Sequence, residues 1–86
     1  MIPMYGFLEG DSIGLLVLAY PNETVSDLIL KLQKSSEMRV ESKAGVQMVY
    51  KNRILNPTLS VSEIGFQPLD YFFVVENVSS YVSENP

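Results

Sequence analysis

One amphipathic helix is expected in a chain whose other apolar segments are short. Thr24 precedes Val25-Ser26-Asp27, so its hydroxyl can accept a hydrogen bond from an early helical N–H while Asp27 reaches back. Apolar residues then recur at helical spacing and define one apolar face: Val25, Leu28, Ile29 and Leu32. A single helix covers only one face of a sheet, so the other face is partly exposed to solvent unless a partner covers it.

The remaining apolar segments predict a sheet of four to five strands. They are rich in apolar, aromatic or β-branched residues and are bounded by turn formers: residues 4–8, 13–20, 46–50, 53–55 and 71–75. Lys51-Asn52 is a two-residue turn signal, because Asn tolerates the left-handed region. Residues 60–65 predict a single helical turn that ends at Gly65.

Composition excludes several classes of function. The 86 residues suffice for one small domain, and the chain has Cys 0 and His 0. Disulfides, thiolate metal sites and the commonest general base are therefore excluded, and we expect neither an enzyme nor a cofactor. Glu9 and Asp11 flank a turn, but two carboxylates without further oxygen ligands do not predict a metal site.

Net charge and hydropathy limit the classes of partner that the chain can have. A net charge of −4 lacks the basic surface that nucleic acid binding requires. No run approaches the roughly 20 apolar residues that span a bilayer. Residues 1–5 have no Lys or Arg ahead of their apolar side chains, unlike a secretory signal. We therefore expect neither nucleic acid nor membrane as a partner, and a cytoplasmic and/or nuclear location.

Three stretches follow one another in a characteristic order. Residues 21–32 combine a strand-end proline, a threonine cap and the amphipathic helix. Residues 47–55 combine a strand, a tight turn and a return strand, and residues 61–66 form a Ser-Glu-x-Gly helical turn ahead of the last strand. In this order and spacing the chain resembles the ubiquitin-like β-grasp domains of the ubiquitin superfamily. An insertion of a few residues is needed only between Leu32 and Val46.

This resemblance implies an α+β fold. It consists of a mixed four- to five-stranded sheet, one main helix packed on one face, and a short helical turn before the last strand. The resemblance covers most of residues 4–77, so we expect a domain over residues 1–77 and a flexible tail or linker start over residues 78–86. That tail contains Ser, Glu, Asn and Pro rather than the two glycines of conjugated members, which implies the non-conjugated type found within larger proteins.

The resemblance also implies an apolar interaction patch on the sheet. Carried over position by position, the patch is Val49, Phe73 and Val75, with Gln47, Asn52 and Arg53 on its rim and Gly10 at the hairpin position where the family has a leucine. The residues that alternate with the patch are Met48, Tyr50, Phe72 and Val74. The resemblance places this second set toward the helix or at the sheet's edge and leaves the patch exposed.

The implied function is a non-catalytic interaction domain. Its expected partners are ubiquitin-binding domains, proteasome subunits or enzymes of the ubiquitin system, bound by a monomer. One alternative is a Ras-associating type of β-grasp that binds a small GTPase, although residues 13–20 contain no Lys or Arg to contact an acidic edge. Another is a structural domain whose sheet packs within a larger protein.

Overall fold

The computed structural model describes residues 1–82. Its elements are β1 (Ile2–Leu8), β2 (Leu15–Ala19), α1 (Val25–Ser36), β3 (Gln47–Tyr50), β4 (Arg53–Ile54), α2 (Val61–Ile64), β5 (Tyr71–Val75) and the 3-10 turn η1 (Val78–Ser80). The predicted α+β order is confirmed, and β5 has the bounds that the sequence predicts.

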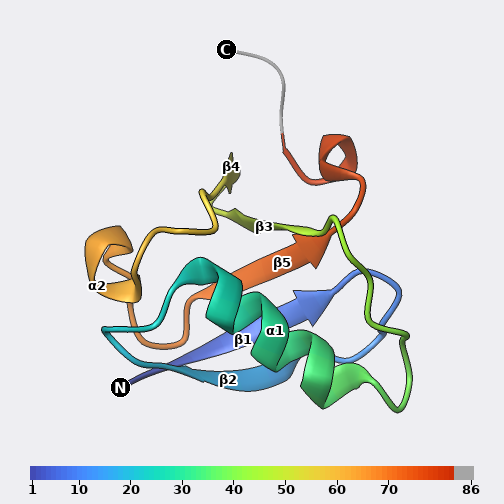
Figure 1. The fold of residues 1–86 in the computed structure, drawn as a ribbon, viewed down its shortest axis with the longest axis horizontal. Coiled ribbons are helices and arrows are strands. Elements are labelled where there is room, and N and C mark those ends of the chain that lie inside the picture. The colour runs from blue at the N-terminus through green and yellow to red at the C-terminus, as the bar shows by residue number, and fades with distance from the viewer. Residues whose placement is uncertain (83–86) are drawn as a thin grey trace.

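The sheet is mixed and contains five strands in the order β2-β1-β5-β3-β4. The hairpins β1–β2 and β3–β4 are antiparallel, and so is the pair β3–β5. The central pair, β1 and β5, is parallel. Figure 1 shows α1 lying across one face of this sheet. We call that face the inner face and the opposite one the outer face.

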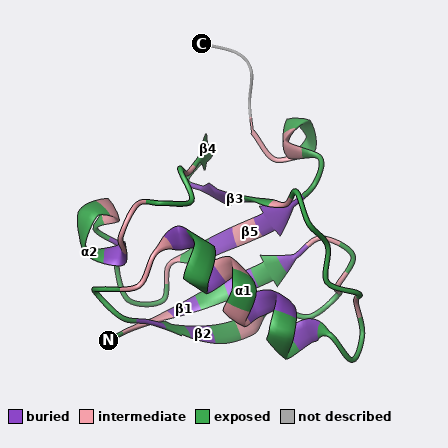
Figure 2. Ribbon diagram, in the orientation of Figure 1, coloured by how far each residue is buried: buried purple, intermediate pink, exposed green. Residues whose placement is uncertain are grey.

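The core fills the space between α1 and the inner face. Thr24 and Asp27 form the predicted capping box at the start of α1, with each side chain accepting from the other residue's backbone N–H. Leu28 and Leu32 are fully buried. The sheet supplies the residues predicted to lie toward the helix or at the sheet's edge, and all of them are buried in the core: Met48, Tyr50, Phe72 and Val74. Figure 2 shows buried segments where α1 and the sheet meet.

Gly6 allows the helix to approach β1 closely. A Cβ built at this position would lie 3.0 Å from both Leu32 methyl carbons and from the Phe72 ring. The space that a side chain would need is therefore taken by α1 and β5.

The two predicted turns have the backbone that their residues favour. Lys51 and Asn52 both have positive φ, 48° and 64°, as the two-residue turn between β3 and β4 requires. α2 begins with a second capping box, between Ser60 and Glu63, and ends at Gly65 with φ of 78°.

A hydrogen bond ties the start of β5 to β3. Tyr50 donates its phenol O–H to the Asp70 carboxylate, which also accepts from the Gln67 backbone N–H at 3.0 Å. Burial of the phenol, together with this hydrogen bond, raises the pKa of Tyr50 to about 12. The same bond is the main reason that the pKa of Asp70 lies below its ordinary value.

Tyr50 should make the domain less stable at alkaline pH. The folded chain keeps the phenol proton up to about 12, whereas an unfolded chain releases it near pH 10. Between these values the unfolded state binds fewer protons, so the free energy of unfolding falls as pH rises. Urea unfolding between about pH 9 and pH 12 should show this fall, and Tyr50→Phe should flatten it. Equal slopes in the two proteins would contradict the assignment.

The chain beyond β5 forms one further short turn. Residues 78–80 form the turn η1, and the backbone N–H groups of Tyr81 and Val82 donate to the Val78 carbonyl at 2.9 Å and 3.0 Å. The Tyr81 ring packs against Phe73 with centroids 5.2 Å apart. A ring contact that composition did not indicate thus joins this segment to β5. The rest of the expected tail, residues 83–86, lies outside the described residues.

Candidate protein-interaction surface

The three predicted patch residues are neighbours on the outer face. Val49 on β3 lies opposite Phe73 on β5, and Val75 follows two positions later on the same strand. Their expected exposure is wrong for two of the three, since Val49 and Val75 have exposed fractions of 1% and 0%. Phe73 is half-buried. Alternation along the strands assigned the correct face, but two of the three side chains on that face are buried.

The predicted rim residues do not stay together. Gln47 lies opposite Val75 and is exposed, and Asn52 is exposed in the turn after β3. Arg53 lies opposite Tyr50, whose side chain belongs to the core, so the register places Arg53 on the inner side of β4. Ile54, which was not predicted, takes the outer position beside Val49 and is 44% exposed.

Gly10 lies in the β1–β2 turn with φ of 92°. Val40, which packs against the inner core, supplies the nearest contact to a Cβ built at Gly10. The carboxylate of the next residue, Asp11, accepts hydrogen bonds from the Arg39 guanidinium, and this pairing lowers the pKa of Asp11. These contacts hold the turn against the segment that follows α1, on the helix side.

The accessible apolar area of the outer face lies over β1, β2 and the start of β5. We call it the open surface, and it consists of Tyr5, Phe7, Leu16, Leu18 and Tyr71. Strand register makes it continuous, because Tyr5 on the middle strand lies opposite Leu16 on one side and Tyr71 on the other. Leu16 and Tyr71 are 58% and 59% exposed. Contiguous exposed apolar surface of this kind is typical of an interaction site.

Aromatic contacts hold the open surface in one arrangement. The Phe7 ring lies 6.3 Å from Tyr71 in an edge-on contact and 5.6 Å from Phe73. Tyr71 and Phe73 meet edge-on at 5.7 Å. Gly14 lies beside Phe7, where a Cβ would approach the ring to 2.5 Å. These contacts restrict the Phe7 and Tyr71 rings before any partner arrives, which lowers the entropic cost of binding.

The strands carry no charge on the outer face. The outward positions are Pro3, Tyr5, Phe7, Leu16, Leu18, Gln47, Val49, Ile54, Tyr71, Phe73 and Val75. Depletion of charge together with Tyr and Phe enrichment is typical of the centre of a protein–protein interface.

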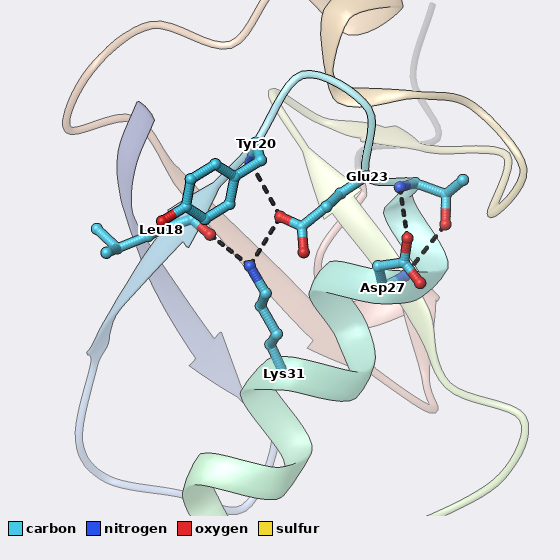
Figure 3. A network of polar contacts seen from close by, with 6 residues as sticks. Leu18, Tyr20, Glu23, Asp27 and Lys31 are labelled. Carbon is cyan, nitrogen blue, oxygen red and sulfur yellow. Dashed lines mark hydrogen bonds and ion pairs between the residues drawn. The ribbon is translucent and has the colours of Figure 1, made fainter. Parts of the chain in front are cut away.

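β2 forms one edge of the sheet, and a lysine occupies part of that edge. Lys31 of α1 donates from Nζ to the Leu18 carbonyl and to Glu23, both at 2.7 Å, and Figure 3 shows these two contacts. The same ammonium lies 5.0 Å from the centre of the Tyr20 ring, and the Tyr20 backbone N–H donates to Glu23 at 2.9 Å. A carbonyl held in this way is not available to an added strand. The open surface, rather than the β2 edge, is therefore the candidate contact area.

Sequence reasoning missed Tyr5, Phe7, Leu16, Leu18 and Tyr71, although a signal was present. A strand with one wet face alternates apolar and polar residues, but Leu15–Ala19 reads LLVLA without a polar residue. Continuous apolar character on both faces of the first hairpin indicates a second buried or binding face.

Two other kinds of site find no support in residues 1–82. Within this range, no group of three or more His, Cys, Asp or Glu side chains could hold a metal ion. No helix of the described chain is both long and apolar enough to cross a membrane.

No family model matches the chain, and no curated protein matches it in sequence. Similar solved structures do exist. A chain of the toluene 4-monooxygenase HD complex superposes with a TM-score of 0.77 at 18% identity, over 85% of this chain and 94% of that one. Ubiquitin from Caldiarchaeum subterraneum gives 0.69 at 22% identity, over 85% and 89%.

A third similar structure is ATBAG1 in complex with HSP70, with a TM-score of 0.71 at 12% identity over 93% of this chain and 42% of that one. At these identities the likeness concerns the fold. Together with the five-stranded mixed sheet, its single main helix and the short helical turn before the last strand, it shows that this chain has the ubiquitin-like β-grasp fold.

Proposed function

We propose that this domain is a non-catalytic protein-interaction module that docks through its open surface. The observation that carries the proposal is the continuous array of exposed Tyr, Phe and Leu side chains across three neighbouring strands, ordered by ring contacts and free of charge. Burying these side chains in a partner supplies hydrophobic free energy without the cost of desolvating a charge.

We propose three classes of partner first: ubiquitin-binding domains, subunits of the proteasome, and enzymes of the ubiquitin system. The ubiquitin fold supports this choice. The burial of Val49 and Val75 leads us to place the first contacts on the open surface rather than on the patch expected from the sequence. We expect Phe7 and Tyr71 to be the central contacts, since large aromatic side chains dominate binding energy at interfaces.

An amide chemical-shift titration tests this proposal. The labelled chain is titrated with a ubiquitin-interacting helix and, separately, with a proteasomal ubiquitin-receptor domain. Shifts should cluster on β1, β2 and the start of β5. Phe7→Asp should abolish them, because it places a charge at the centre of the contact.

Met38→Asp is the matched control. Met38 is 91% exposed, lies beyond the end of α1 and is not part of the open surface, so an aspartate there should leave the titration unchanged. Absence of shifts at millimolar ligand would overturn docking to ubiquitin receptors. Shifts that survive Phe7→Asp would overturn the open surface as the contact area.

A permanent subunit of a larger assembly is the second candidate. It is favoured by the superposition on nearly the whole length of a chain from the toluene 4-monooxygenase HD complex, and by the uncharged outer face, since permanent interfaces are the more apolar ones. A permanent subunit studied alone should self-associate at micromolar concentration, and Phe7→Asp should suppress this. Light scattering separates it from a transient docking module, which stays monomeric.

Binding to a small GTPase and packing within a parent protein have less support. A Ras-associating module would present basic residues from β2, but β2 contains neither Lys nor Arg. Packing of the outer face within a larger parent protein would use the same surface, and docking in trans would then fail for that protein. A cytoplasmic or nuclear location is part of the proposal, and imaging of a tagged chain tests it.

A further inference from the structure

Burial is uneven across the outer face. Val49 and Val75 are 1% and 0% exposed, whereas Tyr5 and Tyr71 on the same face are 42% and 59% exposed. Both valines face away from α1, because the residues that alternate with them belong to the core. Something other than the main helix therefore covers them.

The chain that follows β5 is the candidate cover. It turns back through η1, where Tyr81 and Val82 bond to the Val78 carbonyl, and the Tyr81 ring lies 5.2 Å from Phe73. Val78, Tyr81 and Val82 are each half-buried, so each has lost solvent to neighbouring atoms. Figure 1 shows this turn just past the carboxyl end of β5.

Contacts of Glu76 with Glu9 and Lys43 fix the start of this segment. The Glu76 backbone N–H donates to Glu9 Oε1 at 2.8 Å, and the Glu76 carboxylate pairs with Lys43 at 3.0 Å. These contacts set the direction in which the chain leaves β5. Beyond them the segment contributes apolar contacts, with a tyrosine ring as the anchor.

We infer that residues 78–82 form a built-in cap over the patch of Val49, Phe73 and Val75, and that this cap competes for the patch with a protein partner docked on the neighbouring open surface. The cap also indicates which partner fits: a short helical turn that presents an aromatic side chain three positions after an aliphatic one, as Tyr81 follows Val78. The competition rests on the proposed function, whereas the cap itself does not.

A cap of this size is suited to displacement. Its anchor is one ring contact, and no ion pair of the described chain involves residues 78–82. Ring pairs contribute modestly, so removal of the ring should raise the affinity of a competing partner by about 2- to 10-fold.

The cap is tested without any partner. Methyl groups of Val49 and Val75 are followed by NMR in the presence of a soluble paramagnetic probe, in the wild-type chain, in Tyr81→Ala and in a chain that ends at Asn77. The shortened chain retains all five strands and every residue of the core cluster, and urea unfolding confirms that it is folded. Both changes should raise the relaxation of these methyl groups several-fold.

Tyr5→Ala is the matched control, because Tyr5 lies on the same outer face away from the cap. It should leave the Val49 and Val75 methyl groups protected. If these groups stay protected in Tyr81→Ala and in the shortened chain alike, the cap is overturned.

The competition is tested with the proteasomal ubiquitin-receptor domain as the probe. Tighter binding to Tyr81→Ala than to wild type supports competition, and equal binding overturns it. If the methyl groups become exposed but neither protein binds the probe, docking to that receptor fails while the cap stands.

Discussion

Replacing Phe72 with alanine should lower the free energy of unfolding by about 3–5 kcal/mol. Phe72 is fully buried at the centre of the sheet, where it lies opposite Gly6 of β1 and faces α1. Truncation removes the ring from the core and leaves a cavity that the flanking strands cannot close. Urea unfolding followed by circular dichroism measures the change.

Tyr71→Ala is the control for Phe72→Ala, since it truncates the adjacent aromatic residue on the outer face. Tyr71 is 59% exposed, so its removal should cost far less, about 1 kcal/mol or below. Similar losses at both positions would contradict the assignment of the two faces.

Gly6→Ala should destabilise the domain by about 1–3 kcal/mol, because the added methyl group overpacks a filled core. Its Cβ would lie 3.0 Å from Leu32 and from Phe72, both fully buried and unable to move into solvent. Thermal unfolding of the variant measures the loss.

Gly14→Ala provides an instructive comparison with Gly6→Ala. The new Cβ would approach the Phe7 ring even more closely, to 2.5 Å, but Phe7 is 37% exposed and can rotate toward water. Stability should therefore change by only about 0.5 kcal/mol, while the ring contacts of the open surface are disturbed. If Gly14→Ala lowered the free energy of unfolding more than Gly6→Ala, the exposure of the side chain that meets the new Cβ would not determine the loss of stability.

Local signals made most of the fold predictable. Both helices begin where a hydroxyl residue is followed three positions later by an acid, at Thr24 and Ser60, and both capping boxes form. The turn at Lys51-Asn52 and the end of α2 at Gly65 follow from the positive φ that Asn and Gly tolerate. These features depend on a few neighbouring residues, which a single sequence contains.

The interaction surface was less predictable because exposure is a tertiary property. Alternation placed Val49, Phe73 and Val75 on the outer face, but it carries no information on a segment that returns from elsewhere to cover them. Tyr81 lies in a polar stretch whose composition favours a tail, so its contact with Phe73 was not expected. The face on which Arg53 lies was not predictable from its own strand for a related reason. It is set by the pairing of Arg53 with Tyr50 on the neighbouring strand.

The parallel pairing of β1 with β5 has a consequence during synthesis of the chain. β5 lies between β1 and β3 and joins the two hairpins into one sheet. The first hairpin and α1 can form early from local contacts, but their apolar surface stays uncovered until residue 75 has left the ribosome. The domain must therefore complete its folding after nearly all of it has been translated, and until then its nascent amino-terminal half exposes apolar surface of the kind that is prone to aggregation.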